Sequence, residues 1–525
     1  MIKKHISTAN VDDKVTLGAA FTALTLIFCF THGWVLLSFD ALYWDDWSIL
    51  TSSATEIRRL FHFVGFELAG VFHAWLAPFG PGAYKILMLV SLALMSACVF
   101  FIAENYDFNR THACWITALF IVAPFNTSKI AAVNVAAVMF ASIFFLAWVL
   151  LLRDLKNPSL LQRVCVLALF IVAFYLPSSL AFFALPAMSI AWHAYRSADR
   201  WRQRLGAFFS RADFLLLPFI QFAIFRIFFF KPHASIANEY QKFGIRTSRL
   251  QEAWERIQTD ILLDMPWAVK IILLALPLLI LLRFAKRPLA QKNAAIRNAD
   301  FWMLISLCAC FFALLPYLAV GRLPVFSDWN SRYHLFLPLS FAIVCWSIGQ
   351  YAAAYVQSKW FGVAIYVLIL VLSTGFTVRS YFEYAEDWQK QNQLMQAFRA
   401  QRFINPTDNI VLVDSVVYAK RRSLRYYEYT SMLRHVQPEW NGIALSYAQL
   451  QSVGGGSLES YMDLLGGIDN IQADPRPFGL SSKWRWNDNC VVLVAFEMEG
   501  RVQLRRAIGQ VTAQQPCLLP PLQTY

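Results

Sequence analysis

Eleven apolar stretches, most of them long enough to cross a lipid bilayer as a helix, constrain this chain more than any other feature. A transmembrane helix needs about 20 predominantly apolar residues. The stretches lie at Val15–Phe39, 82–103, 111–125, 128–151, 163–177, 178–195, 212–230, 262–283, 301–320, 333–352 and 360–378. Two of them, 111–125 and 163–177, are short, and Pro124 and Pro177 lie where these helices would end. We therefore expect an α-helical polytopic membrane protein with about eleven transmembrane helices.

The composition supports this expectation. Of the 525 residues, 58% are hydrophobic and 15% are charged, whereas soluble domains average about 45–50% apolar and about 25% charged. So much apolar surface cannot be buried in one soluble core, which excludes an ordinary soluble enzyme and a disordered chain. The net charge is +13, and the basic residues cluster in the loops between apolar stretches. Because they form no continuous basic face, we expect no nucleic-acid partner.

The distribution of Lys and Arg predicts the orientation. Val15–Phe39 is too long for the core of a signal peptide, so it is expected to stay as an uncleaved first span. With the N-terminus in the cytoplasm, the inside loops would hold most of the basic residues, as the positive-inside rule requires. These are Arg153, Lys156, Arg163, Arg196, Arg200, Arg202, Arg204, Arg211, Arg283, Lys286, Arg287, Lys292 and Arg297. We expect a multi-pass protein of the bacterial inner membrane.

Three segments would then lie on the outer face: the first loop 40–81, the short loop 321–332, and the C-terminal segment 379–525. The loop 231–261 would also lie outside; its mixed charges predict an amphipathic surface segment. The predicted domains are a transmembrane domain over 1–378 and an extracytoplasmic domain over 379–525.

The C-terminal segment has a different pattern from the rest of the chain. It combines a predicted helix over 380–403 with β-like runs at 409–413 and 490–494, which predicts a small α/β soluble domain. Its two cysteines, Cys490 and Cys517, either pair in an oxidising compartment or remain buried free thiols.

Paired acids lie directly after the first span, in the stretch Phe39–Trp47. It holds three carboxylates and three large aromatic side chains: Asp40, Tyr43, Trp44, Asp45, Asp46 and Trp47. A carboxylate there could act as a general base toward a hydroxyl, and the aromatic faces could stack on sugar rings. The alternative is a solvated acidic turn beside an aromatic membrane anchor. Asp45 and Asp46 are the candidate catalytic residues, and Asp40, Tyr43, Trp44 and Trp47 are candidate substrate contacts.

A second polar stretch, Gly321–His334, lies between two later apolar runs. Arg322 and Arg332 oppose the inside preference for positive charge, and Arg suits bidentate recognition of phosphate. Alternatively, these arginines reach lipid head groups or pair with Asp328. Tyr333 is a further candidate substrate contact. Three lysines at predicted outer helix ends, Lys85, Lys129 and Lys231, could enlarge a phosphate pocket or serve as membrane anchors.

The first loop is unusual for a connector. Residues 51–80 mix charged and apolar residues in a way that predicts one or two helices lying in the membrane interface. His62 and His73 lie eleven residues apart and could face one site, although lone histidines of this kind are more often surface or packed imidazoles.

This layout resembles the polytopic GT-C glycosyltransferases, which take a sugar from a polyprenyl-phosphate donor. Members of that family have a long first outer loop with an essential acid just after the first span, where Asp45 and Asp46 stand here. Their later outer loops hold the donor phosphate through basic residues, to which Arg322 and Arg332 correspond. Many members also end in a soluble outer-face domain, as 379–525 would.

The resemblance implies transfer of a monosaccharide, a hexose or a pentose, to a cell-envelope glycan or lipid. It implies inversion at the anomeric carbon, with no metal and no other cofactor. Besides the lipid-linked sugar and its acceptor, the expected partners are membrane lipids.

Two other classes of function fit the sequence. A transporter or flippase for lipid-linked sugars would carry its polar residues deep within the spans, often at broken helices. A non-catalytic scaffold would bind a partner through the C-terminal segment. In this chain the acids and arginines concentrate in outer loops, which favours the enzyme.

Overall fold

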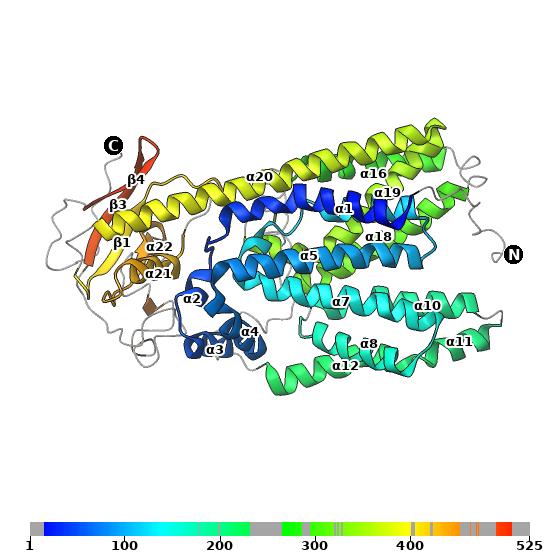
Figure 1. Ribbon diagram of the computed structural model, residues 1–525, viewed down its shortest axis with the longest axis horizontal. Helices are drawn as coiled ribbons and strands as arrows, with labels where there is room; N and C mark the ends of the chain where they lie inside the picture. Colours follow the sequence, from blue (N-terminus) through cyan, green and yellow to red (C-terminus); the bar gives the residue numbers. More distant parts are fainter. Residues whose placement is uncertain are drawn as a thin grey trace.

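The computed structural model shows a long helical bundle with a small α/β domain at one end (Figure 1). The structure describes residues 15–176, 178–197, 200–230, 265–285, 294–319, 322, 325–326, 329–400, 405–420, 424–451, 462–463, 469, 471 and 490–506. The predicted surface segment 231–261, Lys231, Asp328, Cys517 and the Cys490 side chain lie outside the described part.

Every one of the eleven apolar stretches forms a helix or a pair of helices. The helices are α1 (Leu17–His32) with η2 (Gly33–Ser38), α5 (Gly80–Asn105), α6 (Arg110–Val122), α7 (Ala132–Lys156), α8 (Leu160–Ala173), α9 (Ser178–Phe182) with α10 (Ala184–Ser197), α12 (Ala212–Ile224) with η5 (Phe225–Phe229), α16 (Trp267–Ala285), α18 (Ala294–Ala319), α19 (Leu337–Val356) and α20 (Lys359–Ala400). The short helix α6 ends before Pro124, and α8 ends before Pro177, as the prolines predicted.

Six helices of the described residues are long and apolar enough to cross a membrane, and a bent helix pair would make seven. The six are Leu17–Ser38, Glu67–Asn105, Ala132–Lys156, Ile296–Ala319, Leu337–Val356 and Lys359–Ala400. The bent pair joins α11 (Trp201–Phe209) to Ala212–Phe228 at 45°. The chain is therefore an integral membrane protein, and eleven spans stays a prediction.

The first loop contains the two predicted helices and a short one before them. These are α2 (Asp46–Leu50), α3 (Ala54–Phe63) and α4 (Glu67–Leu76), and the turn η3 (Ala77–Phe79) leads into α5. A capping box starts α3: the Ser53 hydroxyl accepts from the Glu56 N–H, and the Glu56 carboxylate accepts from the Ser53 N–H at 2.8 Å. The position of these helices relative to the membrane interface stays a prediction.

The helix α20 runs without a break from the bundle into the soluble domain. Its 42 residues cross the predicted domain boundary at 378/379, so the apolar stretch 360–378 and the helix predicted over 380–403 form one rigid element. Its C-terminal half packs into the core of the small domain through Leu394, Met395 and Phe398.

The small domain contains a four-stranded sheet in the order β2-β1-β3-β4. Its elements are β1 (Asn409–Asp414), α21 (Tyr426–Val436), β2 (Ala444–Ser446), α22 (Tyr447–Gln451), β3 (Cys490–Met498) and β4 (Arg501–Arg506). Strand β1 is parallel to β2 and β3, and β4 is antiparallel to β3. Both predicted β-runs are confirmed, and they pair directly from Asn409 opposite Cys490.

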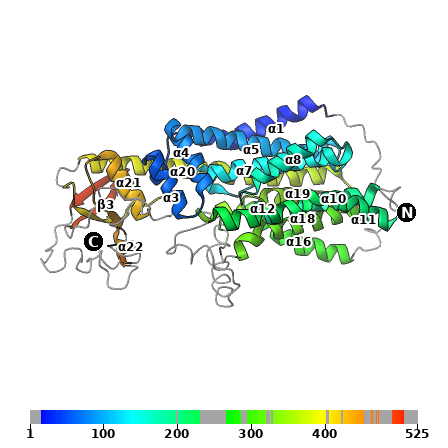
Figure 2. The same ribbon diagram turned by 90° about the horizontal axis from the view of Figure 1, so that it is seen from below.

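The first-loop helices α2, α3 and α4 and the small domain lie at one end of the bundle, and α10 and α11 lie at the other (Figures 1 and 2). At the latter end Arg211 pairs with the buried Asp154 at 2.8 Å, and Arg163 pairs with Asp213 at 2.6 Å. The first loop and the C-terminal domain therefore share one end, as the predicted topology requires, while their extracytoplasmic orientation stays a prediction.

Two glycines allow α19 and α20 to approach closely. A Cβ on Gly349 would lie 2.1 Å from the ring of Tyr366, and one on Gly362 would lie 2.7 Å from the Gly349 carbonyl oxygen. Small residues at such crossings are typical of helix packing in membranes. The Tyr366 ring cannot easily move, because its hydroxyl donates to the Trp346 carbonyl at 2.9 Å and accepts from Gln350 at 2.8 Å.

We expect Gly349→Ala to lower the stability of the purified protein by roughly 1–3 kcal/mol, the usual cost of overpacking. Gly375→Ala is the matched control, because nothing lies within 4 Å of a Cβ there and alanine is the better helix former. Thermal unfolding in detergent checks both. Equal melting temperatures for Gly349→Ala and the wild type would show that the two helices can separate here at no cost.

Candidate functional site

Asp46 is completely buried and ties three segments together. Its Oδ2 accepts a hydrogen bond from the Tyr43 N–H at 3.1 Å, and its Oδ1 accepts from the Val133 N–H at 2.9 Å. The positive charge of Lys85, also buried, attracts the carboxylate. The Lys85 ammonium in turn donates to the Ile130 carbonyl and lies 5.2 Å from the centroid of the Tyr43 ring. The carboxylate thus fixes the first loop against the start of α7.

Burial governs the protonation of Asp46. Loss of solvent raises the pKa of Asp46 from 3.8 to about 6, and the charge of Lys85 and the backbone N–H donors oppose this rise. Both oxygens of this buried carboxylate accept backbone hydrogen bonds, so it anchors the first loop, and its predicted catalytic role stays a prediction.

Asp45 is only partly buried, and its neighbours come from the C-terminal domain. The carboxylate lies within electrostatic range of Tyr427 and Arg425, both at the start of α21. Trp44, just before it, has φ +52°, a left-handed conformation that costs a non-glycine residue about 1–2 kcal/mol. This turn points the two adjacent acids to different surroundings, Asp46 into the bundle and Asp45 toward α21.

The three aromatic side chains of this stretch are buried. The Tyr43 hydroxyl donates to the Tyr384 carbonyl at 2.8 Å, and the Trp47 indole N–H donates to Gln391 Oε1 at 3.1 Å. Tyr43 and Trp44 belong to a buried cluster with Tyr381 and Tyr384. In this arrangement the aromatic rings seat the first loop against α20, and their predicted stacking on a sugar stays a prediction.

The early acidic stretch and the late arginine stretch meet through two indoles. Trp44 and Trp329 are in ring contact, with centroids 5.1 Å apart. Arg332, in η7 (Trp329–His334), lies 4.1 Å above the Trp329 ring and 5.0 Å from the Tyr333 ring. Its Nη2 also donates to the Tyr333 hydroxyl at 3.1 Å. The stretch that carries Asp45 and the stretch that carries Arg332 therefore lie side by side, and the predicted roles of these residues stay predictions.

Arg322, Asp40 and Tyr333 take different positions. The side chains of Arg322 and Asp40 are exposed. The Arg322 N–H donates to the Tyr317 carbonyl at 2.9 Å, and the Tyr317 ring packs on the buried Tyr333 at 4.7 Å. Arg332 is thus brought to the acidic stretch by direct ring contacts, whereas the side chains of Arg322 and Asp40 lie at the surface.

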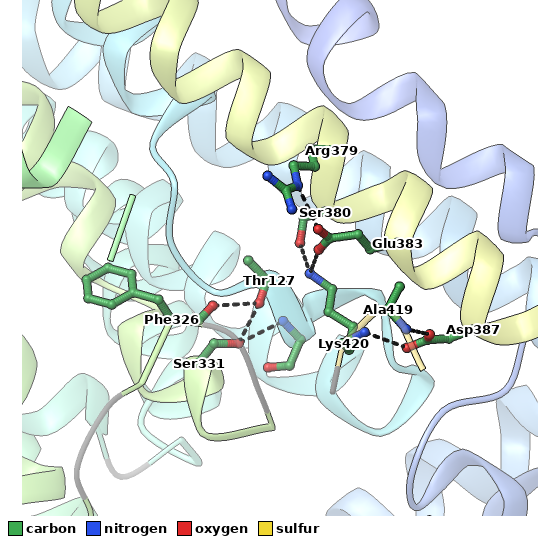
Figure 3. A network of polar contacts seen from close by, with 10 residues as sticks. Thr127, Phe326, Ser331, Arg379, Ser380, Glu383, Asp387, Ala419 and Lys420 are labelled. Atoms are coloured by element: carbon green, nitrogen blue, oxygen red, sulfur yellow. Dashed lines mark hydrogen bonds and ion pairs between the residues drawn. The ribbon is translucent and has the colours of Figure 1, made fainter. Parts of the chain in front are cut away.

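A polar contact joins η4 (Thr127–Ile130) to η7 (Figure 3). The Thr127 hydroxyl bridges the Phe326 carbonyl at 3.2 Å and Ser331 Oγ at 3.1 Å, and the Ser128 N–H donates to Ser331 Oγ at 2.9 Å. Lys129 follows on η4 and is buried, as Lys85 is on α5. Lys85 and Lys129 are therefore internal cations and not membrane anchors at the surface.

Lys129 lines a cavity of about 30 Å³ together with Asn126, His32 and Ser96. The Asn126 side chain contributes to it a buried Oδ1 that has no hydrogen-bond partner among the described residues. The volume suits one or two water molecules and is far below the several hundred Å³ of a site for a sugar-sized ligand. The residues that line it come from neither the acidic stretch Phe39–Trp47 nor the arginine stretch Gly321–His334.

A second network in Figure 3 attaches the small domain to α20. Lys420, almost fully buried, donates to Ser380 Oγ and pairs with Glu383 Oε2, both at 2.7 Å. Asp387 accepts from the N–H groups of Ala419 and Lys420 at 2.6 and 3.3 Å. These contacts fix the loop after β1 to the long helix.

Several of these residues have only a weak signature in the sequence. His62 is exposed and bonds Glu67 at 2.6 Å, whereas His73 is buried between the rings of Phe61 and Tyr84. The two histidines therefore do not share a site. Tyr427 and Lys420 were not identified from sequence, because nothing in their local pattern distinguishes them from ordinary surface or core residues. Trp329 lies in the stretch Gly321–His334, but no role of its own was predicted for it.

No family profile and no curated protein sequence matches this chain. Among solved structures, the chain is similar to the crystal structure of ArnT from Cupriavidus metallidurans bound to undecaprenyl phosphate. The identity is 13%, the match covers 95% of this chain and 99% of that chain, and the TM-score is 0.36. A TM-score of this size does not establish a common fold.

We expect the stability of the wild type to fall relative to an Asp46→Asn variant as pH rises. The folded pKa of Asp46 is raised, so its contribution is fully present below about pH 4 and is lost as pH rises through about 6. Melting temperatures measured between these values check this, with Asp40→Asn as the exposed control on the same loop. Parallel pH curves for the wild type and Asp46→Asn would contradict the raised pKa.

Proposed function

We propose that this protein is a membrane glycosyltransferase of the GT-C kind, which transfers a monosaccharide from a polyprenyl-phosphate donor to a cell-envelope glycan or lipid. One observation carries the proposal: the contact between Trp44 and Trp329, which joins the stretch containing Asp45 to the stretch containing Arg332. A base and a leaving-group partner on two neighbouring segments suit displacement at an anomeric carbon.

Asp45 is the better candidate for the base. It is partly accessible, whereas the Asp46 carboxylate is enclosed and already accepts two backbone hydrogen bonds. In the proposed reaction, the acceptor hydroxyl oxygen attacks the anomeric carbon and its proton passes to Asp45. The bond between that carbon and the phosphate oxygen breaks, and the polyprenyl phosphate leaves with the electron pair. A single displacement inverts the anomeric configuration.

Arg332 is the proposed partner of the leaving phosphate. Its guanidinium lies over the Trp329 ring, and one of its N–H groups donates to the Tyr333 hydroxyl. The remaining N–H donors of the planar group can meet phosphate oxygens. A fixed cation aimed at a developing anion is commonly a large catalytic term. Arg322 lies nearby in the sequence and its side chain is exposed, so it is a second candidate for binding the phosphate. Neither a metal nor another cofactor is required by this scheme.

In cells that lack the gene, a plasmid copy carrying Asp45→Asn should fail to restore the missing sugar on the surface glycan. Loss of a general base costs typically 10²–10⁴-fold in rate, and Arg332→Ala should cost a similar factor, about 10²–10³-fold. Mass spectrometry of cell-envelope glycans and lipids measures the loss whichever molecule is the acceptor.

The matched control is Arg297→Ala. Arg297 is exposed and lies at the start of α18, whereas η7 follows the end of that helix. It should restore the wild-type glycan profile. Full restoration by Asp45→Asn would remove the proposed base, and an unchanged profile in cells lacking the gene would remove the proposed function.

A further inference from the structure

The first turn of α21 is clamped to the turn that carries Asp45. The Trp44 N–H donates to Glu428 Oε1 at 3.2 Å, and Glu428 Oε2 accepts from the Arg425 N–H at 3.0 Å. Glu428 is completely buried. One carboxylate thus joins the left-handed residue just before Asp45 to the start of the helix. Helix α21 therefore belongs structurally to the first loop as well as to the sheet.

The same turn of α21 places a hydroxyl beside Asp45. The Tyr427 hydroxyl accepts a hydrogen bond from Arg425 Nη1 at 3.3 Å. Burial and the negative charges of Asp45 and Glu428 raise the pKa of the Tyr427 hydroxyl, so it remains a protonated donor. Arg425 thus holds a hydroxyl within range of the Asp45 carboxylate.

A second contact fixes the position of Asp45 relative to α21. Trp47 packs on Trp388 of α20 at 6.0 Å and on His435 at the end of α21 at 6.4 Å, in the core of the small domain. Asp45 thus lies between two fixed residues: Trp44, whose N–H is bound by Glu428, and the buried Trp47. These contacts on both sides hold the backbone of Asp45 near Tyr427.

We infer that Tyr427 and Arg425 are positioning residues for Asp45, so that the C-terminal domain completes the transfer site instead of being a separate appendage. A base is commonly oriented by a third group that does not itself react. Tyr427 would act by holding one carboxylate oxygen, which leaves the other directed at the acceptor hydroxyl. This inference rests on the proposed function of Asp45, and it assigns the C-terminal domain a part in that function.

Purified protein, synthetic polyprenyl-phosphate sugars and membranes from cells lacking the gene, as the acceptor source, provide the test. We expect Tyr427→Phe to lower kcat about tenfold or more and to leave KM for the donor within about twofold, since the phosphate contacts are untouched. Arg425→Gln should have a smaller effect in the same direction. Tyr426→Phe, on the same helix turn, should retain the wild-type kcat.

Thermal unfolding of the same variants separates positioning from folding. A positioning role predicts that Tyr427→Phe loses turnover while its melting temperature stays close to that of Tyr426→Phe. Wild-type kcat in Tyr427→Phe, with Asp45→Asn inactive, overturns the inference alone. Wild-type kcat in Asp45→Asn overturns the proposed function and the inference with it. A loss of turnover that follows the loss of stability in every variant also overturns it, because Tyr427 would then be merely structural.

Discussion

The buried carboxylate of Asp46 is the interaction on which the rest of this site depends. It accepts hydrogen bonds from the Tyr43 and Val133 N–H groups and faces the buried charge of Lys85. A carboxylate is costly to bury unless its oxygens are satisfied, so these contacts allow only one placement of the loop. Because Asp46 is fixed, the backbone must turn sharply at Trp44, and Asp45 is left at the edge facing the small domain.

Adjacent acids can therefore have different roles without any difference in residue type. Removal of its two oxygens from solvent gives Asp46 a raised pKa, while Asp45 stays partly accessible to solvent. The aromatic residues of the stretch contribute to the same division. Trp44 contacts Trp329 beneath Arg332, and Trp47 enters the core of the small domain. One turn of chain thus reaches three parts of the molecule.

The continuous helix α20 makes this arrangement rigid. Its apolar half packs in the bundle, and its second half supplies Tyr384, Asp387 and Gln391, which bind the first loop and the loop after β1. A break at the expected boundary would have let the small domain move as a separate body. Since Lys420 is held by Ser380 and Glu383 on the same helix (Figure 3), α20 binds the small domain through polar contacts as well as through apolar side chains in its core.

Several features followed from the sequence by itself: helices at all eleven apolar stretches, the two strands that begin at Asn409 and Cys490, and the acidic stretch after the first span. Apolar length and β-pattern are local properties, so local sequence is enough to predict them. The continuity of α20, the burial of Asp46 against the exposure of Arg322, and the contact of Tyr427 with Asp45 are different. They depend on residues far apart in the chain, and whether a charged or aromatic group is buried depends on what packs over it. Only the tertiary structure decided these, because burial and partner choice are properties of the packed molecule.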